Sequence, residues 1–249
     1  MPLSILIVLA LVAFGAGFVS AIVGAGGTIV LPVLLATGIS PLEALATNKF
    51  QSVCGTSTSA LYYLRHGLIQ LRTLRGAVLG CLLGSAAGTW VVQHIAVHRL
   101  EWLIPTLLIG VALYTLMSPR LRDQPAKPRI STASFAFFVA TPLGFTSGFF
   151  GPGTGTFVTV ALISLLGQSA RQAVAQTKVL VLACNGMSLL LYLLGGQVLW
   201  TIGVLMALGQ VVGARLGAQM VVHRGAALVR PMMVTVTVAL SAYLIVQQL

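Results

Sequence analysis

The sequence predicts an all-α polytopic membrane protein. It is expected to contain two inverted-topology repeats of about five helical segments each, with glycine-broken short helices near the midplane. Three observations carry this prediction. The 249 residues are 57% hydrophobic and only 7% charged, whereas soluble domains carry about 25% charged residues. Several apolar runs are long enough to cross a bilayer core of about 30 Å. A glycine-rich break in an apolar run, at residues 24–27, returns at residues 151–155.

The charge of the chain is strongly positive. Its 14 Lys and Arg residues outnumber three Asp and Glu residues and give a formal net charge of +11. Such a charge could attract nucleic acid, but most of the basic residues stand in short loops between apolar runs, not in a basic patch interleaved with aromatic residues. Positive charge in such loops is typical of the cytoplasmic side of a membrane. We therefore expect a lipid bilayer around the protein and no nucleic-acid partner.

The first half of the chain, residues 1–117, is predicted to form the first membrane repeat. Its opening stretch lacks the positively charged region of a cleaved signal peptide, so we expect the first apolar run to remain as a span. The second segment is so short that, at about 1.5 Å per residue, it covers only about half of the bilayer core. The expected segments lie at about 3–23, 28–37, 42–64, 76–93 and 102–117.

A charged and proline-containing stretch, residues 118–130, separates the halves and is predicted to be a cytoplasmic linker. The second repeat, residues 131–249, follows the plan of the first, including a short segment directly after the glycine break. Its expected segments lie at about 131–150, 156–166, 170–194, 199–220 and 229–247.

The two halves also match residue by residue. Gly24 matches Gly151 at an offset of 127, and beyond the short segment Lys49 matches Lys178 at an offset of 129. A long series of matches at one register, including a lysine and a histidine, indicates an internal duplication. Further matched pairs are Ser20 with Ser147, Tyr63 with Tyr192, His94 with His223, and the series Gly80, Gly84, Gly88 with Gly209, Gly213, Gly217.

The loop charges predict that the repeats are inverted. The loop at 65–75 is strongly basic, whereas its counterpart at 195–204 is uncharged. The loop at 97–101 has no net charge, whereas the counterpart around 224–230 is positive. Because the positive side changes between the halves, the positive-inside rule gives them opposite orientations. We expect the basic loops and the linker in the cytoplasm and both termini outside. If one of the broken units does not cross, the termini lie inside instead.

The two glycine breaks are the first candidate binding residues. A short helix that starts at a break presents free backbone N–H groups and the positive end of its dipole, which suits an anion in a water-filled cavity. The alternative is a simple kink or a close packing point. The occurrence of two breaks at equivalent positions, each before a half-length helix, favours a binding site. Its candidate residues are Gly24, Gly26, Gly27, Gly151, Gly153 and Thr154.

Lys49 and Lys178 are the second candidates. A charged residue at mid-membrane depth costs roughly 3 kcal/mol and is a functional candidate by default. The alternative is that each side chain extends to the membrane surface. The only acid near Lys49 in the sequence is Glu43, six residues earlier and close to the interface. Lysines without carboxylate partners suggest that the substrate supplies the counter-charge and is an anion. Neighbouring polar residues expected to donate or accept hydrogen bonds are Asn48, Gln51, Thr56 and Gln176.

The remaining polar and small residues carry less chemistry. The hydroxyl run at 56–59 could line a polar path or bond back to its own helix. The glycine series are interpreted as seams for close helix packing, and the cysteines as small packing residues. His94 and His223 lie at segment ends, where they are interfacial or, alternatively, carry protons. No nucleophile with its base, metal cluster or nucleotide loop is evident, so we expect neither an enzyme nor a cofactor.

Several of these motifs together resemble the TauE/SafE family of sulfite exporters, also called toluene-sulfonate uptake permeases. They are the glycine break, the short helix with Pro32, the run Ala44-Leu45-Ala46-Thr47-Asn48-Lys49-Phe50-Gln51-Ser52, and the second copy at 148–155 with 173–178. The resemblance implies a multi-pass transporter of sulfur-containing anions in a bacterial inner membrane. It implies substrate-site roles for Asn48, Lys49 and Gln51, with Lys178 as their counterpart. The second half departs from the Asn-Lys-x-Gln motif, so we expect the first half to bind more tightly.

The expected function is secondary transport of a small anion, such as sulfite or an organosulfonate, by alternating access between inverted halves. Each negative charge that leaves a negative interior gains about 2.3 kcal/mol per 100 mV, which favours export. Export therefore needs no coupled ion, although a lysine or histidine could carry a proton. The alternatives are a membrane scaffold or assembly factor without a substrate, and an anion channel.

Overall fold

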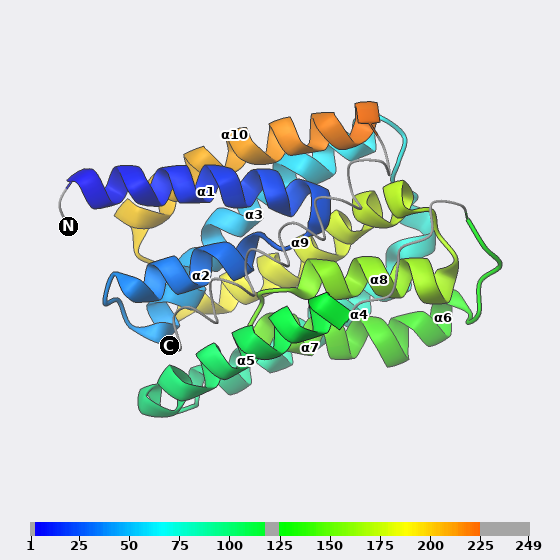
Figure 1. The fold of residues 1–249 in the computed structure, drawn as a ribbon. Coiled ribbons are helices and arrows are strands. Elements are labelled where there is room, and N and C mark those ends of the chain that lie inside the picture. Colours follow the sequence, from blue (N-terminus) through cyan, green and yellow to red (C-terminus); the bar gives the residue numbers. More distant parts are fainter. Residues whose placement is uncertain (1–2, 118–124, 225–249) are drawn as a thin grey trace.

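The computed structural model describes residues 3–117 and 125–224, and all regular structure in this part of the chain is helical (Figure 1). Four of the described helices are long and apolar enough to cross a membrane, at Ser4–Val23, Leu71–Gln93, Ala170–Leu194 and Trp200–Arg224. For these residues, the prediction of a helical protein with several membrane spans is therefore confirmed. The expected segment at 229–247 and most of the charged linker lie outside the described residues.

The first half contains five helices, as the hydropathy pattern predicts. They are α1 (Leu3–Val23), α2 (Gly26–Ala36), α3 (Pro41–Arg65), α4 (Leu71–Gln93) and α5 (Val97–Met117). At the start of α3, the Ser40 hydroxyl accepts a hydrogen bond from the Glu43 backbone, and the Glu43 carboxylate accepts one from the Ser40 backbone N–H. This reciprocal cap fixes where the helix begins. The starts of α4 and α5 were predicted five residues too late, because hydropathy marks the apolar part of a helix and not its exposed polar turns.

The second half begins with one long helical stretch, as predicted for 131–150. It consists of α6 (Thr132–Phe135), the π-helical segment η1 (Ala136–Ala140) and α7 (Thr141–Phe149). The π-helical turn ends just before Pro142, which has no N–H to donate to the preceding turn. The helices α8 (Thr154–Leu166), α9 (Ala170–Leu194) and α10 (Trp200–Arg224) follow. The backbone N–H groups of Ala126 and Arg129, in the linker, donate to carbonyls at the end of α8 at 2.8 Å each.

Each short helix folds back along the helix that precedes it. Gly26 at the start of α2 lies against Ala16 and Ser20 of α1, and α8 shares an apolar core with α6. The other apolar core contains residues of α2, the first half of α1 and the start of α3. The two short helices therefore begin near one another and extend toward opposite ends of the molecule (Figure 1). Along α3, the buried polar residues lie between the part that joins one core and Tyr63, which joins the other.

Helices from opposite halves of the sequence pack together most closely. The α1 helix lies along α10, where Gly209, Gly213 and Gly217 face the backbone of α1 at Ala10, Phe14 and Phe18. The α4 helix lies along η1 and α7, where Gly80, Gly84 and Gly88 face Ala136, Thr141, Phe145 and Phe149. The glycine series are thus close packing seams, as predicted from their spacing.

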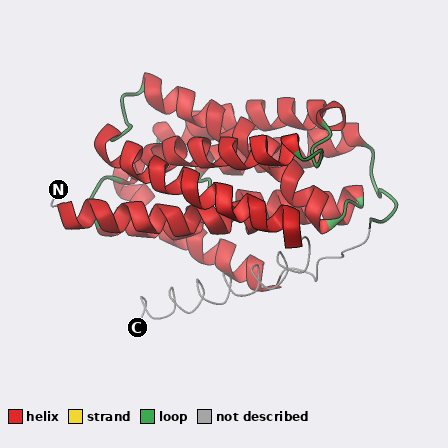
Figure 2. Cartoon of the chain, turned by 90° about the horizontal axis from the view of Figure 1, so that it is seen from above, coloured by secondary structure: helices red, strands yellow, loops and turns green. Residues whose placement is uncertain are grey.

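Apart from α5, the described helices form two bundles, each of which combines both halves of the chain. The first bundle is α1, α2, α3 and α10, and the second bundle is α4, α6 with η1 and α7, α8 and α9. The most extensive contact between the two bundles is the one between α3 and α9. Within the second bundle, Ser85 of α4 and Ser188 of α9 bring their hydroxyl oxygens to 2.8 Å. The two ends of the molecule hold most of the loops (Figure 2).

A side chain at the centre of a glycine seam is expected to destabilise the protein. A Cβ at Gly213 would lie 2.9 Å from the backbone nitrogen of Phe18 and even closer to the Phe14 carbonyl oxygen. We expect Gly213→Ala to cost about 1–3 kcal/mol by overpacking and to lower Tm by roughly 2–4 °C per kcal/mol. The matched control is Gly186→Ala in α9, where nothing lies within 4 Å. Alanine there should leave Tm unchanged or raise it, and an equal fall in both variants would contradict the seam.

Candidate functional site

The two glycine breaks meet in the interior of the protein. Gly24, Gly151 and Gly153 have φ angles of 87°, 95° and 81°, in the left-handed region that side chains disfavour. A Cβ at Gly24 would lie 2.7 Å from the carbonyl carbon of Gly155. The first break therefore touches the second without room for a side chain, and both are held by backbone geometry that glycine permits.

The starts of α2 and α8 lie at this meeting point. A Cβ at Gly27 would lie 3.4 Å from the Cα atom of Pro152. The residues at the N-caps of the two short helices, Ala25 and Gly153, have no side-chain oxygen that could cap the helix. Since the first N–H groups of a helix have no partners within it, and its dipole is positive there, two positive backbone ends converge on one region.

Lys49 extends from α3 to the second break. Its side chain is 1% exposed, and its ammonium donates hydrogen bonds to the Ser147 carbonyl oxygen at 2.5 Å and to Asn185 Oδ1 at 3.0 Å. A Cβ at Gly151 would lie 2.7 Å from Lys49 Nζ. The ammonium thus stands directly beside the backbone of the second break.

Lys178 makes the equivalent contact with the other half. It is 2% exposed, and its ammonium donates to the carbonyl oxygen of Ser20, near the end of α1. Each lysine therefore reaches the carbonyl end of the broken helix in the opposite half, where the helix dipole is negative. The alternative in which these side chains extend to the membrane surface is wrong, because both are buried.

Two polar neighbours predicted from the sequence lie close to the first break. Gln51 Nε2 donates to Asn48 Oδ1 at 3.1 Å, and Asn48 Nδ2 lies 3.5 Å from the position of a Cβ on Gly27. The Gln51 Oε1 atom is buried and has no partner among the described residues. Buried polar atoms normally have a hydrogen-bond partner, so this oxygen is free to accept a hydrogen bond from a ligand or water.

Other candidates have different surroundings. Gln176 accepts a hydrogen bond from Gln168 at 2.6 Å, next to the turn between α8 and α9, so the structure does not bring its amide to the breaks. Thr154 Oγ1 donates to the Gly151 carbonyl oxygen at 2.8 Å within the second break. Thr56 is buried in α3, whereas Thr58 and Ser59 in the same hydroxyl run bond back to their own helix. Of the two interpretations of that run, back-bonding therefore holds for these two residues.

The structure adds residues that sequence reasoning did not assign to the site. Ser20 and Ser147 take part through backbone carbonyls, which any residue type supplies, so no side-chain motif could reveal them. Asn185 contacts Lys49 across the bundles, and the sequence signals it by a polar side chain in an apolar segment and by its repeat match with Thr56. Gly155 belongs to the second break, yet its contact with Gly24 depends on how the halves fold together.

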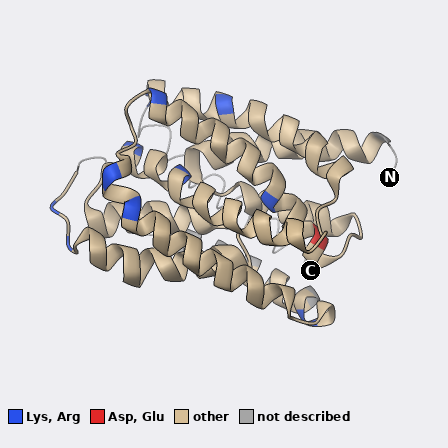
Figure 3. Ribbon diagram, turned by 180° about the vertical axis from the view of Figure 1, so that it is seen from behind, with Lys and Arg blue, Asp and Glu red and all other residues tan. Residues whose placement is uncertain are grey.

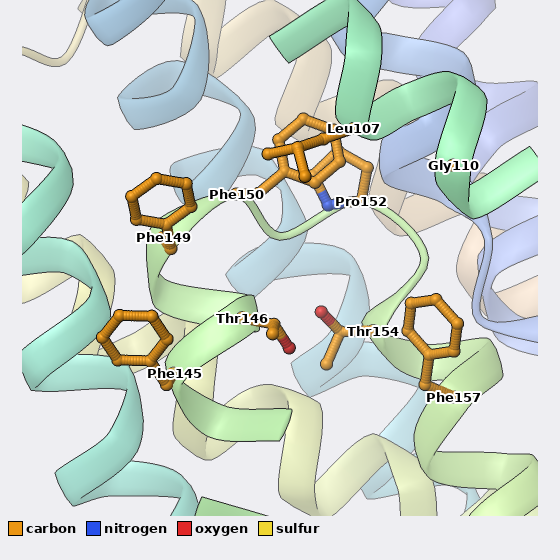
Figure 4. Close-up of a pocket in the computed structure, with 9 residues that line it drawn as sticks. All are labelled: Leu107, Gly110, Phe145, Thr146, Phe149, Phe150, Pro152, Thr154 and Phe157. Atoms are coloured by element: carbon orange, nitrogen blue, oxygen red, sulfur yellow. The ribbon is translucent and has the colours of Figure 1, made fainter. Parts of the chain in front are cut away.

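An apolar pocket of about 270 Å³ borders the second break (Figure 4). The two hydroxyl groups in its wall are both hydrogen-bonded to nearby backbone. Thr146 Oγ1 donates to the Leu143 carbonyl oxygen, and Thr154 Oγ1 donates to the Gly151 carbonyl oxygen. The wall is otherwise formed by apolar groups from α5, α7, α8 and the turn between α7 and α8. The lining residues are Leu107, Gly110, Phe145, Thr146, Phe149, Phe150, Pro152, Thr154 and Phe157.

In the part of the chain that the structure describes, no group of three or more His, Cys, Asp or Glu residues could hold a metal ion. The two lysines make no contact with a carboxylate there, and their oxygen partners are two carbonyls and one amide. The arrangement is thus a positively charged interior site that could hold an anion.

Comparison with known proteins gives one consistent result. A family model described as "Sulfite exporter TauE/SafE" matches residues 9–244. A "Probable membrane transporter protein" of Haemophilus influenzae is 41% identical over 246 residues, which cover 99% of this chain and 96% of the relative. The "Probable membrane transporter protein YfcA" of Escherichia coli K12 is 37% identical over 238 residues, covering 96% and 88%. No solved structure matches.

Proposed function

Because the chain belongs to the TauE/SafE sulfite exporter family, whose members are membrane transporters rather than enzymes, we propose that it is a secondary transporter that exports small sulfur-containing anions. Sulfite and organosulfonates are the proposed substrates. The proposed location is the inner membrane of a bacterium, with the chain crossing the bilayer several times.

The observation that carries the proposal is a pair of buried ammonium groups at the meeting point of two helix breaks. Neither ammonium contacts a carboxylate among the described residues. Burying an unpaired charge costs several kcal/mol even after relaxation. The carbonyls of Ser147 and Ser20 offset part of this cost but cancel no charge. An anion bound between the ammonium groups and the N–H ends of α2 and α8 would supply the missing counter-charge.

The proposed mechanism is alternating access between two inverted repeats, residues 1–117 and 131–249, joined by the linker at 118–130. The packing supports a specific form of it, in which the moving bodies are the first and second bundles and not the two halves of the sequence. The glycine seams tie α1 to α10 and α4 to α7 by backbone contact, so these pairs move together. The contact of α3 with α9 then opens and closes around the lysines.

The proposed orientation places the basic end of the molecule in the cytoplasm. Figure 3 shows that most of the described Lys and Arg residues outside the interior, in blue, lie toward one end of the molecule. The red of the acidic residues lies toward the other end. This distribution supports a cytoplasmic basic end and an external amino terminus. Export of an anion from the basic side is then driven by the membrane potential, by about 2.3 kcal/mol per charge and 100 mV.

The test is flux in liposomes of bacterial phospholipid that contain the purified protein. Sulfite or methanesulfonate is loaded inside, a potassium diffusion potential is set, and efflux is measured against protein-free liposomes, with and without a pH gradient. We expect saturable efflux that rises with an inside-negative potential. Absence of both flux and binding for every anion would favour the scaffold alternative. Flux that does not saturate would favour a channel, and flux that follows the pH gradient alone would show proton coupling.

A further inference from the structure

Asn185 is the side-chain partner of the Lys49 ammonium. It lies on α9, the helix that also carries Lys178, and is 7% exposed. Its Oδ1 atom accepts the hydrogen bond from Lys49 Nζ at 3.0 Å, across the contact between the two bundles. Together with the Ser147 carbonyl it fixes the ammonium beside Gly151. Asn185 therefore helps to decide where one of the two buried charges stands.

The two lysines are held unequally, and Asn185 is the reason. At the repeat offset of 129, the position equivalent to Asn185 is Thr56, and no hydrogen bond joins Thr56 to Lys178. In the described structure Lys178 has a single acceptor, the Ser20 carbonyl oxygen, whereas Lys49 has two. An ammonium fixed by two acceptors loses less freedom when an anion binds, so Lys49 is the better organised of the two charges.

The residue type at position 185 determines whether that charge remains available. A carboxylate has nearly the same shape as the amide and could accept the same hydrogen bond. It would also place a negative charge about 3 Å from the ammonium, which at low dielectric is a strong attraction. The amide oxygen holds the ammonium in place and leaves its charge uncancelled.

We propose that Asn185 is a positioning residue that sets the charge selectivity of the site: it orients Lys49 toward the second break without neutralising it, so that the counter-charge must come from an anionic substrate. This inference rests on the proposed function, because it assumes that an anion binds beside Lys49. It goes further in assigning the preference for anions to the neutrality of one side chain.

The test compares three substitutions at position 185. The inference predicts that ranking these variants by Tm gives a different order from ranking them by anion affinity. Asn185→Asp keeps shape and acceptor but adds a charge, Asn185→Leu keeps shape but removes the acceptor, and Asn185→Thr introduces the neutral residue found at position 56. For each purified variant, Tm and the affinities for sulfite and methanesulfonate are measured, the latter by calorimetry. We expect the Asp variant to melt above the Leu variant and yet to bind at least tenfold more weakly than it. The Thr variant should bind closest to the wild type.

A merely structural role predicts the same order in both measurements, with the variant that melts lowest also binding worst. That result would overturn the inference and leave the proposed function standing, as would an Asp variant that binds as tightly as the wild type. Failure of the wild-type protein itself to bind either anion would overturn the proposed function and the inference with it.

Discussion

Replacing Lys49 with glutamine is expected to abolish measurable anion binding and saturable transport. An ammonium about 4 Å from a bound anion contributes about 4 kcal/mol at an effective dielectric constant of 20, which is roughly a thousandfold in affinity. Thermal stability should be retained or should rise, because the substitution removes a buried charge that has no charged partner in residues 3–117 and 125–224. Calorimetric titration with methanesulfonate and efflux from liposomes measure the two losses, and a melting curve measures the stability.

Two matched variants make this prediction specific. Lys178→Gln removes the equivalent charge, and a smaller loss is expected because Lys178 is held by one acceptor where Lys49 has two. Lys127→Gln removes an exposed charge in the linker and should leave binding unchanged. If Lys49→Gln transports as well as the wild type, the assignment of the site to the meeting breaks is wrong, whatever the substrate proves to be.

Locking α4 to α9 by a disulfide is expected to leave transport intact. The helices belong to opposite halves of the sequence but to the same bundle, and the hydroxyl oxygens of Ser85 and Ser188 lie 2.8 Å apart. Cysteines at both positions, with Cys54, Cys81 and Cys184 replaced by alanine, would be oxidised with copper phenanthroline, which takes one electron from each thiol as their protons leave and the S–S bond forms. Efflux is then compared before and after oxidation. A protein whose bundles move as units should transport at an unchanged rate.

A second pair of cysteines, placed across the contact between the two bundles, is expected to stop transport when oxidised. Thr156 of α8 donates a hydrogen bond to the Val23 carbonyl oxygen of α1 at 3.5 Å, across the contact between the bundles. Cysteines at these two positions, once oxidised, should stop transport, and a reductant should restore it. Should the lock between Ser85→Cys and Ser188→Cys stop transport reversibly instead, the moving bodies would be the two sequence halves and the bundle mechanism would be refuted.

Local features of the fold were largely predictable from the sequence. The α9 helix spans the predicted 170–194, because Ser169 caps its start and the change from apolar to glycine-rich sequence marks its end. The short helices after the two breaks were also predictable, since glycine is costly within a helix. The start of α4 was not, because its first five residues include two arginines and resemble a loop, although arginine is a good helix former.

The site was only partly predictable, for a different reason. Burial of Lys49 and Lys178 followed from their positions within apolar segments, but their acceptors are backbone carbonyls of Ser147 and Ser20, which leave no trace in side-chain chemistry. Gln176 has the polarity expected of a ligand-binding residue, and the turn next to it supplied a nearer partner in Gln168. The pairing of α1 with α10 depends on contacts between distant parts of the chain. The glycine spacing predicts a close helix contact but does not indicate which helix is the partner.

That pairing has a consequence for how the protein is made. The glycines of α10 that receive the backbone of α1 leave the ribosome roughly 200 residues after it, which at 5–20 residues per second is a delay of about 10–40 seconds. During that interval α1 is stable as an isolated helix in lipid, because its own backbone hydrogen bonds are complete, but its seam is open. The α1 helix is therefore inserted long before the helix that covers its seam, and the newborn protein must remain incompletely assembled until α10 has been synthesised.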